Sequence, residues 1–427
     1  MNIISAIISL SIMIFGIVPD FGFAGGGGSG SGGGGGSSSS SFSSDSSYSS
    51  GSSNSDPLTT LIVFIIITVF IVVASSRASK KARQRKLALN NSTPQEKWIH
   101  AEADRIFKAY QADWTNFNLD GIKSYATPSY FAHASLMLEA LKNLHRVNKV
   151  SQLEVHVVYL MDPVNNATNL PANIRVEFEF SGLDEVVDTA TSKKLYSAHA
   201  RNITETWNFI YDGKTLKLSG ISQPTESAPH LIKSLAQFAQ ENQLFYSPDW
   251  GRYALPSRGL IFGGATLSQS DVNNHIIGKW RGESEKAKKA GSELLIQLYT
   301  YSPTPNVPSS YYLVGQINVP KDYLGVIIKS KKYKAASKPP KSYDKFELEW
   351  PDFNQRYDVY ASSRDALPAF ELLNPQFMEY LYDKNLNYNL EVTDNVIYIF
   401  ANVKNITEAD YAELLDVLKL AHKELKM

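Results

Sequence analysis

Two apolar runs stand at the start of the chain, ahead of a long segment in which apolar and polar positions are mixed. The first run, Ile3 to Val18, ends at Pro19, and the small residues Gly22 and Ala24 suit cleavage after Ala24. The second run, Leu58 to Ala74, carries no charge and reaches about 26 Å as a helix. We therefore predict a signal peptide or an uncleaved first apolar span at 1–24 and a transmembrane helix at 58–74.

The alternative for the second run is a buried core helix, but its polar positions are all threonines, whereas core helices usually show more polar positions at helical spacing. A cluster of basic residues follows the run, in a linker at 75–95, and favours the cytoplasmic side of a membrane. Its members are Arg77, Lys80, Lys81, Arg83, Arg85 and Lys86. The Gly/Ser segment 25–57 cannot bury enough apolar surface to fold. We predict that it is disordered and lies on the outer side of the membrane. The prediction is a single-pass protein of the cell (plasma) membrane with cytoplasmic C-terminal domains.

The periodicity after the linker predicts a first domain at 96–224. Apolar residues from Trp98 to Trp114 recur at three- and four-residue steps, and helices are also expected at 120–125 and from Pro128 through Leu144. The period then becomes two, which predicts strands at 153–161, 174–180, 203–211 and 216–221, with a hairpin turn at 212–213. Helices followed by antiparallel strands predict an α+β domain with helices on one face of a curved sheet.

One face of the two central strands is strongly aromatic and holds a single carboxylate. The residues predicted to line an apolar pocket on this face are Phe178, Phe180, Glu205, Trp207 and Phe209. Large aromatics there are either pocket lining or core under the 136–144 helix. Glu205 is a pocket carboxylate with a raised pKa, or else it lies near the rim of the sheet or is paired with an arginine such as Arg175.

Several segments of the first domain resemble the Tim-forty-four-like domain family. They include Trp114, Asp120, the step from Tyr125 to Pro128-Ser129-Tyr130-Phe131, the run 148–155, the run 204–209 and Lys217-Leu218. The sequence departs from the family at Leu216, where such domains often have Trp. The resemblance covers about 130 residues and extends to the signal, glycine-rich stretch and single span. It implies a cone-like fold with a curved sheet and an apolar pocket, and a membrane-associated tether or adaptor role in protein translocation.

A second α+β domain is predicted at 225–427. Strands are expected at 293–301, 311–319, 325–329, 357–361 and 396–400, and helices near 230–242 and at 271–280, 375–383 and 408–426. The runs 346–349, 353–354, 356–361 and 372–378 are similar to a bacterial domain family of unknown function (number thirty-one thirty-seven). That resemblance implies a fold boundary and no activity.

The composition of the chain excludes several kinds of catalytic and metal-binding chemistry. The chain has 427 residues, zero formal net charge and no cysteine, which excludes disulfides, thiol catalysis and cysteine-ligated metals. No P-loop, metalloprotease or serine-hydrolase motif is present. Residues 25–30 match G-x-G-x-x-G formally, but no strand precedes them and no helix follows, so we reject this match. The sequence predicts no catalytic residue, cofactor or metal, and no nucleic-acid partner; the expected partners are the lipid bilayer and a protein.

We therefore expect a membrane-anchored, non-enzymatic adaptor or tether that binds protein, peptide or lipid at the inner face. The alternative is a cone-fold hydrolase or isomerase that uses Glu205 as a pocket carboxylate, with His156 or His199 approaching it for acid–base catalysis.

Overall fold

The computed structural model describes residues 92–162, 170–222, 233–247, 255, 259–262, 271–281, 293–302, 312–332, 338–363, 369, 372–384, 387–402 and 407–424. Within these ranges no helix combines the length and the apolar character that a bilayer crossing requires. The predicted segments 1–24, 25–57 and 58–74 lie outside the described residues, as does nearly all of the linker 75–95.

The described chain begins with three helices: α3 (Pro94–Thr115), α4 (Leu119–Tyr125) and α5 (Pro128–Asn143). A capping box starts α3, because the Glu96 backbone N–H donates to Thr93 Oγ1 at 3.2 Å and the Thr93 N–H donates to Glu96 Oε2 at 2.8 Å. At the start of α5, Thr127 Oγ1 accepts from the Tyr130 backbone N–H at 3.4 Å, and proline follows at the first helical position. The predicted helices are confirmed.

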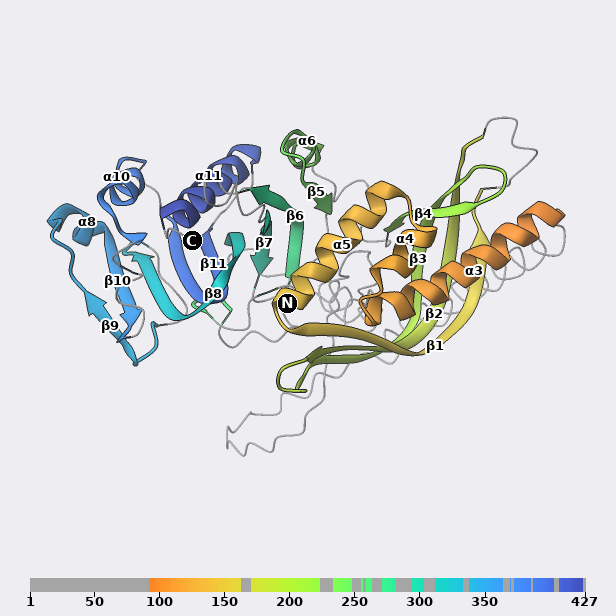
Figure 1. Ribbon diagram of the computed structural model, residues 1–427, viewed down its shortest axis with the longest axis horizontal. Coiled ribbons are helices and arrows are strands. Elements are labelled where there is room, and N and C mark those ends of the chain that lie inside the picture. The colour runs from red at the N-terminus through yellow and green to blue at the C-terminus, as the bar shows by residue number, and fades with distance from the viewer. Residues whose placement is uncertain are drawn as a thin grey trace, which may run out of the picture.

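A four-stranded antiparallel sheet follows in the order β1-β2-β3-β4. Its strands are β1 (Arg146–Leu160), β2 (Ala172–Asp188), β3 (Lys194–Tyr211) and β4 (Leu216–Ser222). Tyr211 pairs with Leu216 across the predicted hairpin turn, where Gly213 has φ +97°. The three helices lie against one face of this curved sheet (Figure 1). We call α3 to α5 with β1 to β4 the first domain.

The second domain contains a seven-stranded sheet in the order β5-β6-β7-β8-β10-β9, with β11 paired to β8. Its strands are β5 (Phe245–Ser247), β6 (Asp271–Arg281), β7 (Glu293–Ser302), β8 (Tyr312–Ser330), β9 (Tyr343–Phe346), β10 (Tyr357–Ser362) and β11 (Asn389–Asn402). The named helices are α6 (Lys233–Glu241), α8 (Pro351–Arg356), α10 (Pro375–Asp383) and α11 (Glu408–Glu424). All of the strand pairings in this second sheet are antiparallel, as they are in the first sheet. Both domains are therefore mixed α+β.

The two faces of the second sheet are buried by different partners. Ile296 and Leu298 of β7 pack in one cluster with residues of α6, α10 and α11. The neighbouring residues Leu295 and Tyr299 point to the opposite face, where Leu295 joins the core of the first domain. The second sheet is therefore covered by helices on one face and, in part, by the first domain on the other.

Two predictions for the second domain were wrong. Residues 271–280 form the strand β6 and not a helix, and the expected strands 311–319 and 325–329 are parts of one strand, β8. The pairing of β6 with β7 shifts register between Asn273 and Ile276, and Asn274 has φ +53°. This bulge breaks the period-two alternation and leaves apolar residues at a helix-like spacing.

Candidate functional site

The residues predicted to line a pocket lie together on one face of β2 and β3. Phe178 is opposite Glu205, and Val176 is opposite Trp207, in the antiparallel register of the two strands. Phe178, Phe180, Glu205, Trp207 and Phe209 are all fully buried. The predicted shared face is confirmed, and the structure places it in the core of the first domain.

Phe107 of α3 packs directly on this aromatic face, and the buried residues of the 136–144 helix belong to the same core cluster. The Phe107 ring stacks on Phe178 with centroids 4.5 Å apart, and it contacts Phe180 at 5.0 Å and Trp207 at 4.9 Å. Aromatic contacts of this kind are worth about 0.5–1.5 kcal/mol each beyond the area they bury. A ligand at these rings would have to displace Phe107, so the role of these residues in binding stays a prediction.

Glu205 lies inside this aromatic core. The Trp207 Nε1–H donates a hydrogen bond to Glu205 Oε2 at 2.9 Å. Nearby, the Tyr130 hydroxyl donates to the Tyr110 hydroxyl at 3.0 Å, and burial raises the pKa of Tyr110 well above its usual value, with Tyr130 and then Glu205 adding to the effect. Arg175, the expected partner of Glu205, instead pairs with Asp162 at 2.8 Å on the surface.

The histidines considered as partners of Glu205 do not approach it. His156 is exposed and its Nε2 lies 2.8 Å from Ser181 Oγ, while His199 is exposed on β3. Because Glu205 is fully buried, these side chains form no acid–base pair with it. Among the described residues, no group of three or more His, Asp or Glu is arranged to hold a metal ion. The six basic residues predicted to flank the membrane, Arg77 to Lys86, lie outside the described residues.

An exposed apolar surface lies at one end of the first domain. Trp98 at the start of α3 is 41% exposed, and Leu170 before β2 is 47% exposed. The Trp98 ring contacts the Tyr211 ring at 5.8 Å, the Tyr211 hydroxyl donates to the Gly213 carbonyl at 2.8 Å, and a methyl group on Gly213 would come within 2.8 Å of Leu170 Cδ1. We call the exposed side chains of Trp98 and Leu170, together with Gly213 and the buried Tyr211 beneath them, the apolar end patch.

The position of this patch follows from the fold. The start of α3 and the turn between β3 and β4 both lie at the end of the molecule furthest from β9 (Figure 1). Among the described residues, one other large apolar side chain is comparably exposed: Leu119, which is 39% exposed and lies beyond the opposite end of α3.

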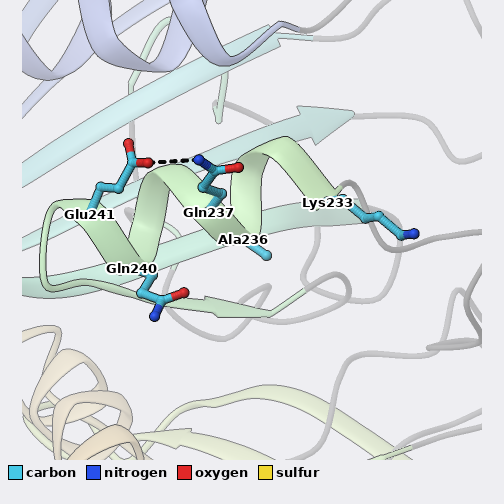
Figure 2. A pocket seen from close by; sticks show the side chains of 5 residues that line it. All are labelled: Lys233, Ala236, Gln237, Gln240 and Glu241. Carbon is cyan, nitrogen blue, oxygen red and sulfur yellow. Dashed lines mark hydrogen bonds between the residues drawn. The ribbon is translucent and has the colours of Figure 1, made fainter.

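A shallow pocket lies on the outer side of α6. It is lined by Lys233, Ala236, Gln237, Gln240 and Glu241, and Gln237 Nε2 donates to Glu241 Oε1 at 2.8 Å (Figure 2). All five residues come from this one helix, whose other side buries Leu235, Phe238 and Ala239. The lining is a solvated polar helix face, and it holds no set of converging groups of the kind that fixes a small ligand.

A buried polar strip crosses the second sheet on the face that meets the first domain. His275 Nε2 on β6 lies 3.1 Å from Gln297 Oε1 on β7, and the Tyr299 hydroxyl donates to Gln316 Oε1 on β8 at 2.7 Å. Burial lowers the pKa of His275 to about 3 and raises the pKa of Tyr299 well above its usual value. This strip could not be predicted from the sequence, because its members come from strands whose pairing depends on the tertiary fold.

Comparison with known proteins confirms the second of the two resemblances. The family described as "Protein of unknown function (DUF3137)" matches residues 312–421. No curated protein matches the chain. The crystal structure of the mycobacterial trehalose monomycolate transport factor A, TtfA, is similar over 45% of this chain and 93% of that chain, with 13% sequence identity and a TM-score of 0.31.

Proposed function

We propose that this chain is a single-pass membrane protein that acts as a non-enzymatic adaptor at the inner face of the membrane, with the apolar end patch of its first domain seated on the bilayer. A role in protein transport is part of the proposal. It is supported by the resemblance of the first domain to the Tim-forty-four-like family. The single observation that carries the seating is the patch itself, because it gathers at the point where the chain arrives from the predicted span.

The length of the linker brings the patch within reach of the membrane. Residues 75–93 separate the end of the predicted span from Pro94. A flexible chain of this length has an end-to-end distance of roughly 25 Å. Trp98 lies one turn into the helix that begins there, so it is held within that distance of the bilayer surface.

The chemistry of the patch suits the membrane interface. Tryptophan, the exposed aromatic residue of the patch, is enriched at the headgroup level, where its apolar ring and its polar N–H are both satisfied. Leu170 adds an aliphatic side chain at the same end. The basic linker supplies attraction to anionic lipids of about 1 kcal/mol for each Lys or Arg near the surface.

The second domain then extends away from the membrane. The start of α3 and strand β9 lie at opposite ends of the longest axis of the molecule (Figure 1). Seating the first end on the bilayer presents the second domain, which contains the family match, to the cytoplasm. We place the binding of a protein partner there, because the aromatic face of the first domain is filled by Phe107.

The chain contains no cysteine, so single cysteines introduced by mutation test the proposed membrane topology. Ser40→Cys is expected to react with an impermeant maleimide in intact cells. Lys108→Cys, on the exposed side of α3, is expected to react only after the membrane is permeabilised. Labelling of Lys108→Cys in intact cells would overturn the proposed orientation. Cross-linked partners recovered from native membranes then identify the protein that the adaptor binds.

A further inference from the structure

The contact between the two domains has an apolar centre and a polar rim. Ile277 of β6 and Leu295 of β7 join the core cluster of the first domain. At the rim, Lys279 of β6 forms an ion pair with Glu139 of α5, and Asn395 Nδ2 donates to the Asn143 carbonyl at 3.2 Å. Helix α5 lies between the two sheets (Figure 1). Its buried residues surround most of its circumference, as expected of a helix packed on both sides.

Two histidines occupy this contact, one from each domain. The His133 ring on α5 stacks on the Phe245 ring on β5, with centroids 5.1 Å apart and planes 4° apart. His133 Nε2 is shielded from solvent and makes no hydrogen bond among the described residues. His275 is buried on β6 and bonded to Gln297. His133 itself is half-buried, and protonation of its shielded Nε2 edge would place a donor where no hydrogen-bond acceptor is available among the described residues.

The surrounding charges do not favour protonation of either ring. Burial lowers the pKa of His133 to about 4. Burial also lowers the pKa of His275 to about 3, and a charge on His133 would lower it further, while the Gln297 hydrogen bond opposes the shift. Each imidazole would therefore repel the other once it was charged.

Titratable groups lie on several elements around the two histidines. On β1, Arg146 is itself buried, and burial lowers its pKa to about 10, with Asp188 acting against this. On β7 the Tyr299 ring lies 6.1 Å from the His275 ring. On β5, Tyr246 packs with the cluster on the helix-covered face, and its hydroxyl donates to Asn274 Oδ1 at 3.0 Å. Glu139 is the carboxylate at the rim, and it is already paired with Lys279.

We infer that the contact between α5 and β6 is an acid-sensitive latch, which holds the first domain on the second sheet at neutral pH and releases it when the imidazole of His133 or His275 in the contact is protonated. Because each ring is neutral in the closed state and takes up a proton readily once exposed, closure is strongest above about pH 6.5. It weakens by up to about tenfold per pH unit for each histidine as the pH falls from 6.5 toward 4. The latch does not depend on the membrane seating of the first domain.

The test measures the distance between spin labels on the two domains of the full chain. Labels at Lys108→Cys on α3 and Glu379→Cys on α10 lie on exposed positions. At pH 7.5 one narrow distance is expected, and at pH 5 a broad second population is expected with unchanged far-ultraviolet circular dichroism. An unchanged distance down to pH 4.5 would overturn the latch.

Variants assign the response to the two rings. His133→Phe combined with His275→Gln keeps a stacking ring and a polar neighbour, and it is expected to stay closed at pH 5. Two controls are expected to open as the wild type does: His156→Gln, which removes an exposed histidine, and Glu139→Gln, which removes the rim ion pair. Opening of the double variant at the wild-type pH would overturn the assignment.

A measurement on the wild type keeps the inference testable if the double variant fails to fold. Exchange of the imidazole C2 proton, followed by mass spectrometry, reports the pKa of each histidine. The latch requires the pKa values of His133 and His275 to lie at least one pH unit below the ordinary histidine value of about 6.5. Values near 6.5 for both rings would refute it.

Discussion

The ring of Phe107 on α3 stacks on the ring of Phe178 on β2, with centroids 4.5 Å apart and an angle of 14° between their planes. Through this contact, Phe107 covers the aromatic face of the first sheet and makes it part of the core. It joins the first helix of the domain to the central strands and closes the face that the sequence suggested as a pocket.

Truncation of the Phe178 side chain is expected to lower the stability of the first domain. Phe178→Ala should lower the free energy of unfolding by about 3–5 kcal/mol, because a buried aromatic ring is lost and a cavity remains. Trp98→Ala is the matched control; its ring is partly exposed, so the loss should be under about 1 kcal/mol. Denaturant unfolding of the two variants measures the difference. A small loss for Phe178→Ala, together with an apolar ligand that raises the melting temperature of the wild type, would restore the pocket.

Glu205 is expected to be structural. Glu205→Gln keeps an oxygen that accepts from the Trp207 indole N–H, so cellular function and melting temperature should stay near those of the wild type. Glu205→Leu removes the acceptor and should cost about 1–3 kcal/mol, since a buried donor is left unsatisfied. Loss of function in Glu205→Gln with an unchanged melt would instead indicate carboxylate chemistry and revive the hydrolase or isomerase alternative.

Stability should fall in mild acid. Folding lowers the pKa of His133 to about 4 and that of His275 to about 3, from about 6.5 in the unfolded chain. The contribution of the neutral rings is therefore complete above pH 6.5 and is lost as the pH falls toward those values, at up to about 1.4 kcal/mol per pH unit for each ring. Urea midpoints at pH 7.5, 6 and 5 measure the slope. His275→Gln should flatten it, and an identical slope in that variant would contradict the assignment.

The basic linker is expected to fix orientation. Changing Arg77, Lys80, Lys81, Arg83, Arg85 and Lys86 to glutamate reverses the charge that follows the predicted span. The variant should insert with mixed orientation and bind anionic vesicles more weakly, by up to about 1 kcal/mol per residue. Maleimide labelling of Lys108→Cys in intact cells reports the fraction inverted. Labelling as low as in the parent would show that orientation is set elsewhere in the chain.

The first domain could be predicted from its sequence because its signals are local. The capping box at Thr93 and Glu96, the prolines that open α3 and α5, and the alternation of 174–180 each act within one element. The hairpin at Gly213 is likewise specified by adjacent residues. These features agree with one another, so the elements and the pairing of β2 with β3 follow from them.

The remainder depends on contacts between distant residues. Nothing near 178 indicates that Phe107 covers it, and nothing near His133 indicates that it stacks on Phe245. The bulge at 273–276 hides the strand period of β6, and both faces of that strand are buried. The apolar end patch joins Trp98 to Tyr211, which are brought together by the closure of the domain.

The seating of the apolar end patch is the central claim, and one measurement addresses it directly. In the full cysteine-free chain, placed in vesicles with anionic lipid, nitroxide labels are attached at Leu170→Cys or at Leu119→Cys. The two leucines are similarly exposed but lie at opposite ends of the first domain. We expect the label at 170 to collide with oxygen and to be shielded from a water-soluble nickel complex, and the label at 119 to show the reverse. Equal access of the nickel complex to both labels would show that the patch faces water and that the first domain is not seated on the bilayer.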